Sequence, residues 1–419
     1  METFTAIASL LGVAAILSFV NDRYLRLQTD IGLLLLAVVV TLLLRLAEYF
    51  IPSGATSVLQ QLTQSFNLND TLLKGVLCFM LFRGSVNVRW SNLREQRWLV
   101  LSLAFAGTAL ACVMTGGLAY ASLSLLGAAI TLSQALLFGA LIAATDPIAA
   151  IGILSKIGLP KNLETVVDGE SLLNDGVAVV LFTIFAGMAL GTGAHGGAGA
   201  IFAREVLGGA ALGVVGWLLL HWLMPRAGSY HTALLVSLGA VACLYALAQH
   251  LHVSGPIATV MAGLLAGNIT APHVDQVVAA PVRTFWAGLD ELLNALLFVF
   301  VGLHVVLINP LVGITPGVPA LSAIMAVLVA RALTVWTIVS RLDAAGVIRA
   351  DRLGLTKLLT WGGLRGGLSL ALAVSLPDSS WKPLILNMAF AAVVFSIVVQ
   401  GLTIERMFTS SQLSGMLRS

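Results

Sequence analysis

The chain has 419 residues, of which 22 are Lys or Arg and 19 are Asp or Glu, so about one residue in ten is charged. A soluble domain carries roughly one charged residue in four, and a globular protein of this length could not cover its surface with so few. With 58% apolar residues, a mean hydropathy of +0.99 and a net charge of only +3, the composition excludes a cytosolic enzyme, a secreted domain, a disordered chain and a nucleic-acid binder. It predicts an all-α polytopic membrane protein.

Apolar runs long enough to cross a bilayer, which takes about 20 residues, recur along the whole chain. They predict thirteen spans, at residues 3–20, 31–50, 70–87, 98–125, 133–157, 163–190, 202–223, 231–250, 255–269, 285–308, 318–341, 353–376 and 383–405. The run 98–125 is long enough for two spans, and the polar segment 53–69 is expected to form a surface helix or a loop. Little chain follows the last span, so no soluble C-terminal domain is expected.

The basic residues indicate the orientation, because cytoplasmic loops carry an excess of Lys and Arg. With the N-terminus outside, the inside loops hold Arg23, Arg26, Arg89, Arg94, Arg97, Lys156, Lys161, Arg226, Arg283, Arg341, Arg349, Arg352, Lys357, Arg406 and Arg418. The outside loops then hold only Arg204 and Lys382. We therefore expect a multi-pass protein with its N-terminus outside and its C-terminus inside.

The sixth predicted span carries two acidic residues deep in the membrane, Glu170 and Asp175. On a helix Ser171 and Asn174 share a face with them, since residues four apart are neighbours. Asp168 lies nearer the inner end of the span, where solvent explains its charge. A structural polar seam needs only the serine and the asparagine, whereas a carboxylate near the midplane costs about 3 kcal/mol even on the mildest scale. We interpret Asp175 as functional and Glu170 as a paired structural acid.

The fifth predicted span contains Thr145, Asp146 and Pro147 in its middle. Pro147 removes a backbone donor and moves the preceding residue away from helical geometry, so carbonyls near residues 143–145 lose their helical partners. Broken helices are tolerated at membrane depth where they line a cavity, and freed carbonyls are good ligands for a small hard cation. An ordinary proline kink needs no carboxylate. The added Asp146 therefore favours a binding site.

The twelfth predicted span contains four glycines within the segment from Trp361 to Gly367, and each weakens a helix by about 1 kcal/mol. Close helix packing uses such glycines, but the presence of Arg365 between Gly363 and Gly366 favours a second broken helix. The fifth and twelfth spans are seven apart in order. Spans 4–6 and 11–13 then form two units of opposite orientation, which predicts an inverted repeat with two broken helices that cross.

Arg331 lies in the interior of the eleventh predicted span, where an arginine needs a carboxylate partner. Glu170 is the partner that we predict. This pairing leaves Asp146 and Asp175 available for a cation or a proton. A site that binds one or the other, and opens to one side at a time, is an exchanger that couples a monovalent cation to protons, and it needs no cofactor.

At these residues the chain resembles the NhaP/NHE-type sodium:proton antiporters, the monovalent cation:proton antiporter-1 family. The resemblance is carried by Thr145-Asp-Pro, by Gly169-Glu-Ser-Leu-Leu-Asn-Asp-Gly176, by the helix of Arg331 and by Trp361-Gly-Gly-Leu-Arg-Gly, and it covers nearly the whole chain. It implies exchange of Na+ or Li+ for H+ by alternating access, with Asp175 binding cation and proton in turn.

The resemblance also implies the remaining site roles. Asp146, the Thr145 carbonyl and the Ser171 hydroxyl would complete the Na+ site with Asp175. Asn174 would also belong to the cation- and proton-binding residues, and it would mark a subtype that is usually electroneutral. Glu170 and Arg331 would form a stabilising ion pair. The implied assembly is a homodimer in a bacterial-type inner membrane. Its core domain would span about 98–190 and 318–405, and its dimerisation domain about 1–97 and 200–308.

The sequence departs from this family at Arg83, which follows Leu81 and Phe82 where many relatives carry an acidic residue. K+/H+ exchange stays open, because carboxylate sites discriminate weakly between Na+ and K+. An alternative of another class is an intramembrane aspartyl protease that uses Asp146 and Asp175, although the chain has no GxGD-type signature. An ion channel is a further alternative, which the predicted inverted repeat disfavours.

Overall fold

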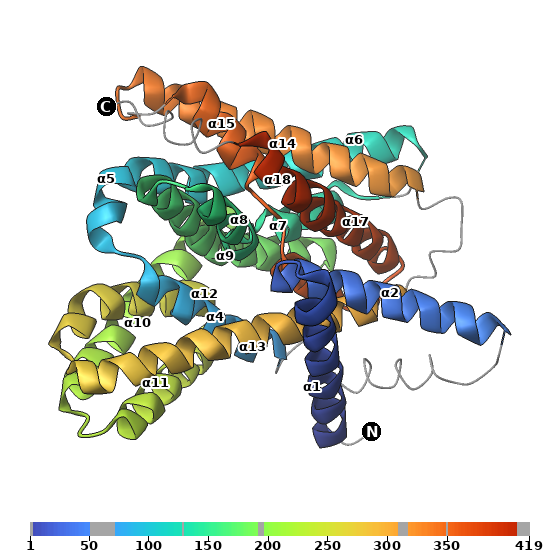
Figure 1. The fold of residues 1–419 in the computed structure, drawn as a ribbon. Coiled ribbons are helices and arrows are strands. Elements are labelled where there is room, and N and C mark those ends of the chain that lie inside the picture. The colour runs from blue at the N-terminus through green and yellow to red at the C-terminus, as the bar shows by residue number, and fades with distance from the viewer. Residues whose placement is uncertain are drawn as a thin grey trace.

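The computed structural model describes residues 3–50, 72–127, 130–191, 197–308, 317–348 and 351–408, and every regular element in these ranges is a helix (Figure 1). The polar segment 53–69, expected as a surface helix or a loop, lies outside the described residues. The helices form two groups, one above the other in Figure 1.

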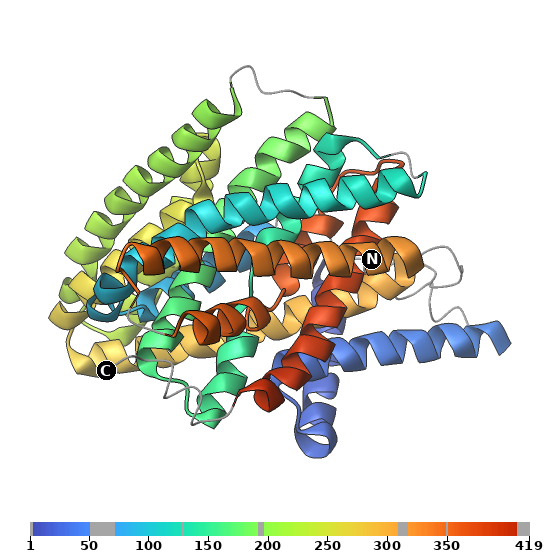
Figure 2. The ribbon, with the colours of Figure 1, turned by 90° about the horizontal axis from the view of Figure 1, so that it is seen from above.

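The first group holds the helices on either side of the two predicted helix breaks. Its members are α5 (Trp90–Leu101), α6 (Thr108–Leu125), α7 (Leu132–Ala143), α8 (Pro147–Leu154), α9 (Lys161–Ala189), α14 (Gly317–Ala344), α15 (Arg352–Trp361), α16 (Gly367–Val374), α17 (Lys382–Val394) and α18 (Gly401–Met407). Helix α6 packs against α7 and α14, and Figure 2 shows α6 and α14 running alongside each other. Helix α7 is apolar on all sides, and it is buried from Leu137 to Ala143 because neighbours surround it.

The second group consists of α4 (Leu72–Asn87), α10 (Ala198–Leu223), α11 (Tyr230–His250), α12 (Gly255–Leu265) and α13 (Gln276–Ile308). Helix α12 packs against α4 and α10, while α1 (Thr3–Val20) and α2 (Thr29–Phe50) pack against α13. The groups contact each other mainly where α9 packs against α12 and α10 and where α13 packs against α16, with smaller contacts of α4 with α9 and α16 and of α13 with α17. The candidate site lies along this border.

Seven helical segments of the described chain are long and apolar enough to cross a membrane. They are Ile7–Leu25, Trp90–Leu125, Lys161–Ala189, Gly199–Arg226, Tyr230–His250, Gly317–Ala344 and Lys382–Met407. Shorter apolar helices at Thr29–Leu44, Gly75–Asn87 and Leu132–Ala143 also coincide with predicted spans. A polytopic all-helical protein is therefore found, while the count of thirteen spans and their orientation stay predictions.

The predicted span 98–125 is one helix rather than two. It begins at Trp90, and α5 continues into α6 through a π-helical turn at Ser102–Gly107. Its first turns pack against α9, so the boundary predicted between residues 97 and 98 falls inside a helix of the first group. A second π-helical turn, Phe395–Gln400, connects α17 with α18. Such turns occur frequently at functional sites, and both lie beside the candidate site described next.

Candidate functional site

Residues 144–146 separate two helices, α7 and α8, within the stretch predicted as the fifth span. Helix α7 starts with a capping box at Thr131 and ends at Ala143, and α8 starts at Pro147. The intervening residues 144–146 are not helical, and Ala144 has extended geometry with a ψ of 138°. Pro147 has no N–H and disfavours helical geometry in Asp146, so the carbonyls at the end of α7 need other donors.

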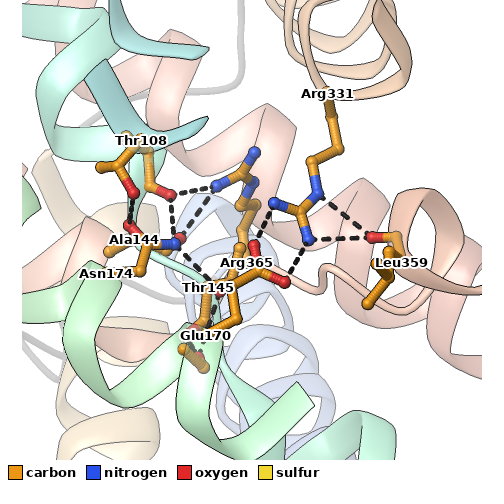
Figure 3. Close-up of polar contacts among 10 residues, drawn as sticks. Thr108, Ala144, Thr145, Glu170, Asn174, Arg331, Leu359 and Arg365 are labelled. Atoms are coloured by element: carbon orange, nitrogen blue, oxygen red, sulfur yellow. Dashed lines mark hydrogen bonds and ion pairs between the residues drawn. The ribbon is translucent and has the colours of Figure 1, made fainter. Parts of the chain in front are cut away.

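Two of these carbonyls are bound by Arg365, which lies between α15 and α16. One guanidinium nitrogen of Arg365 donates to the carbonyl oxygens of Ala143 and Ala144, at 2.5 and 3.1 Å (Figure 3). Arg365 is only 2% exposed, and its Nε atom has no hydrogen-bond partner among the described residues. A buried cation therefore offsets the partial negative charge at the C-terminal end of α7.

Side chains of α9 satisfy the rest of the break. The Asn174 amide nitrogen donates to the Ala143 carbonyl at 3.0 Å and to the Thr145 hydroxyl at 3.1 Å, and its oxygen accepts from Thr108 at 2.9 Å. The Ser171 hydroxyl donates to the Thr145 carbonyl and accepts from the Thr145 hydroxyl at 3.1 Å. All of these residues are buried. Thr108 directly follows the π-helical turn that ends α5, which connects that turn to the site.

The second interruption lies between α15 and α16 and bonds directly to the first. Helix α15 is capped by Asp351 and ends at Trp361, and α16 begins at Gly367. The Leu364 carbonyl accepts from the Asp146 backbone N–H at 2.7 Å. The Arg365 backbone N–H donates to the Ser396 hydroxyl, in the π-helical turn before α18, at 2.9 Å.

Gly363 and Gly366 have no room for a side chain at the second interruption. A Cβ atom at Gly363 would lie 2.6 Å from Nε of Arg331, and one at Gly366 would overlap the carboxylate of Asp146. Both contacts would be shorter than real Cβ contacts, so a larger residue at Gly363 would displace the Arg331 guanidinium of α14, and one at Gly366 would push the second interruption away from Asp146. Both positions thus require glycine for steric reasons, in addition to any weakening of the helix.

Glu170 and Arg331, the predicted partners, are brought together in the structure. Their contact is bidentate, with N–O distances of 2.5 and 3.0 Å, and Arg331 also donates twice to the Leu359 carbonyl (Figure 3). Both side chains are less than a tenth exposed. The pair links α9 with α14, and its third partner lies in α15.

A cavity of about 220 Å³ borders the first interruption. Thr145, Asp146 and Asp175 line it, as predicted for ion-binding residues. Asp168 and Asp290 also line it. No lysine, arginine or histidine is present among the described residues of its wall, so four carboxylates face a space without a basic side chain. Such an acidic space favours a cation over an anion.

The position of Asp175 suits a residue that changes partner. Its Oδ1 atom is buried and has no hydrogen-bond partner within the described part of the chain. A buried carboxylate oxygen that the protein leaves unsatisfied is costly and calls for an explanation. In this cavity a cation or a proton supplies one.

Two predicted ion-binding residues lie beside the cavity without lining it. Ser171 and Asn174 point at the interrupted backbone, and Asn174 uses both amide donor bonds on protein groups. Pro147 is the first residue of α8, and Arg365 binds the Ala143 carbonyl at the end of α7. The structure therefore separates the predicted set into residues that face the cavity and residues that hold the interruption.

The cavity wall also contains acids and polar groups that the sequence analysis did not assign to the ion site. Asp168, expected at a solvated helix end, is partly buried in the cavity wall about two turns below Asp175. Asp290 and Asn294 of α13 are four residues apart and both line the cavity, and so does the buried hydroxyl of Ser369, which has no described hydrogen-bond partner. The spacing of Asp290 and Asn294 on an apolar span is the signal that could have identified them.

A model of the family described as "Sodium/hydrogen exchanger, transmembrane" matches residues 54–410. The chain belongs to this family. It is 38% identical over 403 residues to the Na+/H+ antiporter NhaP of Pseudomonas aeruginosa, covering 95% of this chain and 94% of that protein. It is 34% identical over 375 residues to the Na+/H+ antiporter NhaH of Halobacillus dabanensis, covering 88% of this chain and 89% of that one.

Among solved structures, the sodium proton antiporter MjNhaP1 of Methanocaldococcus jannaschii is similar in fold. The TM-score is 0.78 at 20% identity, and the match covers 99% of this chain and 100% of that chain. Membership of the sodium/hydrogen exchanger family agrees with the transporter, rather than enzyme, interpretation of the sequence. It gives no support to an intramembrane protease.

Proposed function

We propose that this protein exchanges Na+ or Li+ for H+ across a bacterial-type inner membrane by alternating access. The observation that carries this proposal is the acidic cavity at the first interruption, where Asp146 and Asp175 meet without any basic residue in the described wall. The family and the NhaP and NhaH relatives point to the same activity. No cofactor is needed, because binding and release of the two ions is the whole reaction.

The chemistry of the cavity suits a small hard cation, which prefers oxygen ligands. Asp146 and Asp175 supply charged oxygens, and the Thr145 carbonyl and the Ser171 hydroxyl lie at the same break. We assign Asp146, Asp175 and Thr145 to the transported Na+ and place Ser171 beside the ion, where its hydroxyl bonds Thr145. Because a proton occupies the same Asp175 oxygen that the cation needs, the two ions compete and are carried in turn.

In this proposal α7 with α8, and α15 with α16, are the two discontinuous spans of an inverted repeat. Backbone that is not helical is tolerated at membrane depth when it lines a cavity or is bound by protein, as residues 144–146 and 362–366 are. With thirteen spans and an outside N-terminus, the cavity wall at Asn87 and Asp168 lies toward the inside. The described conformation is then open to the cytoplasm.

The remaining features follow from the same assignment. Glu170 and Arg331 cancel each other and stabilise the core without carrying ions, and Asn174 adds no charge at the site. We therefore propose electroneutral exchange of one cation for one proton. The first helix group, including α5 from Trp90, forms the moving core, and the second group with α1 and α2 forms the dimerisation domain of a homodimer.

Everted vesicles loaded with a pH-sensitive dye test the activity. Adding NaCl should reverse the quenching produced by a proton gradient, and Asp175→Ala should reduce the response to that of vesicles without the protein. Asp378→Ala is the matched control, because this carboxylate is exposed and pairs only with Lys382. Persistence of the full response in Asp175→Ala overturns the assignment.

The same vesicles separate the alternatives. Replacing Na+ by Li+ or K+ ranks the cations, and a response to K+ at least equal to that to Na+ selects K+/H+ exchange. Clamping the membrane potential with valinomycin and K+ should leave the rate of Na+-driven exchange unchanged. A rate that follows the potential contradicts the electroneutral assignment.

A further inference from the structure

A second cavity, of about 90 Å³, lies within the second helix group and away from the four carboxylates. It is enclosed by α4, α10, α11, α13 and the turns after α12, in the lower left part of Figure 1. Its walls are largely apolar, with side chains such as Val86, Leu220, Met224 and Val282.

Two arginines, Arg83 of α4 and Arg283 of α13, enter this apolar space. The Nε atom and one Nη atom of Arg83 are buried and have no hydrogen-bond partner among the described residues. Arg283 is exposed and makes one long hydrogen bond, of 3.5 Å, to Gln276. Two unsatisfied guanidinium donors in an apolar cavity are costly, and an anionic acceptor would satisfy them.

No acceptor for these donors is found among the described residues. The negative charges of Asp290 and Glu291 favour the charged form of Arg83, whereas the positive charge of Arg283 disfavours it. No described carboxylate forms an ion pair with Arg83. The two hydroxyls in the wall are already in use, since Ser237 accepts from Trp286 and Thr270 accepts from Trp217. Snorkelling does not explain Arg83 either, because two of its guanidinium nitrogens are withdrawn from solvent.

The depth of the cavity indicates which anion fits. Arg83 lies one turn before the end of α4, and Arg283 lies two turns after the start of α13, so both are near a helix end. In the proposed topology these ends lie at the cytoplasmic surface, beside the loop arginines that follow α4. Lipid phosphates occupy that level of a bilayer. Basic pockets between membrane helices on the cytoplasmic side bind lipid head groups, and the cytoplasmic leaflet is rich in anionic lipid.

We propose that this cavity binds the phosphate of an anionic phospholipid between Arg83 and Arg283. Guanidinium groups recognise phosphate through paired charge-assisted hydrogen bonds. The apolar walls would contact the acyl chains where they join the glycerol. The site uses Arg83, at which the sequence departs from its family's acidic pattern. It is separate from the ion-binding cavity and does not depend on the exchange assigned to Asp175.

Purified full-length protein in neutral detergent tests the site through its thermal unfolding temperature. Phosphatidylglycerol should raise this temperature more than phosphatidylcholine does, and native mass spectrometry should detect retained phosphatidylglycerol. Arg83→Gln and Arg283→Gln should each remove the difference and weaken phosphatidylglycerol binding by at least about tenfold, the loss of a charge-assisted hydrogen bond. Arg226→Gln should keep both effects, because Arg226 is exposed, bonds Trp222 and does not line the cavity.

Three outcomes overturn the proposal. If Arg83→Gln and Arg283→Gln keep the stabilisation by phosphatidylglycerol, the arginines do not hold the lipid. If Arg226→Gln loses it equally, the effect is a diffuse attraction of the surface. If inorganic phosphate gives the full stabilisation without lipid, the ligand is a free anion. Since Arg283 is exposed, Arg283→Gln remains informative even where Arg83→Gln fails to fold.

Discussion

Arg365, in the interruption between α15 and α16, donates hydrogen bonds to the carbonyls of Ala143 and Ala144 at the interruption between α7 and α8. Two segments that lie more than two hundred residues apart in the chain are thus hydrogen-bonded to each other at their interruptions. A backbone bond from Asp146 to the Leu364 carbonyl joins them a second time. The ion-binding cavity therefore depends on the guanidinium group of Arg365, although Arg365 does not line the cavity.

Replacing Arg365 tests this dependence. Arg365→Ala leaves two buried carbonyls with fewer donors, so we expect a loss of about 2 kcal/mol or more in stability and loss of transport. Arg365→Lys keeps the charge but not the planar fork of donors, so it should be intermediate. Thermal unfolding in detergent and Na+-driven dequenching measure the two effects. Unchanged values in Arg365→Ala would show that these bonds contribute nothing.

The ion pair of Glu170 and Arg331 should behave as a unit. Glu170→Gln or Arg331→Gln alone leaves a buried charge without its partner, which costs about 3–5 kcal/mol. The double variant removes both charges and should be more stable than either single variant. A double-mutant cycle of unfolding temperatures measures this coupling. The surface pair Lys382 and Asp378 serves as the control, and Asp378→Asn should cause no measurable change. Additive losses from Glu170 and Arg331 would contradict a coupled pair.

Gly366→Ala tests the close approach of the two interruptions. The added Cβ would overlap the Asp146 carboxylate and displace it from the site. A displacement of about 1 Å can cost about 100-fold in rate, so we expect transport to fall on that order while the protein still folds. Gly239→Ala on α11 is the matched control, because its Cβ would meet no atom within 4 Å. Equal transport by the two variants would rule out a steric role for Gly366.

The sequence was sufficient to predict the residues that are energetically unfavourable in a membrane whatever their neighbours are. A carboxylate at Asp175, a proline at Pro147 and an arginine at Arg331 each need a reason wherever neighbouring spans lie, and the structure puts the first two at the interruption and the third against Glu170. The glycines between Trp361 and Gly367 likewise indicated the second interruption.

What the sequence could not provide is which groups meet across spans. It offered no partner for Arg365, because its acceptors are backbone carbonyls that every residue possesses. It assigned Asn174 to the cation, although the freed carbonyls of α7 take its donors. Asp168 and Asp290 are recognised as cavity residues only from the packing of α9 and α13 around one cavity.

Asp168 and Asp290 supply the last prediction, which separates attraction of the cation from its transport. Both line the cavity with Asp146 and Asp175, but neither lies at the interruption. Their charge should concentrate cations in the cavity, so Asp168→Asn and Asp290→Asn should raise the apparent KM for Na+ several-fold and leave the maximal rate unchanged.

Salt provides the control for this effect. At about 0.1 M ionic strength the Debye length is about 10 Å, so added choline chloride should bring the KM values of wild type and both variants together. Asp22→Asn removes an exposed acid outside the cavity and should behave as wild type in every condition. A fall in the maximal rate at unchanged KM would instead place Asp168 or Asp290 in the transport step itself, beside Asp175.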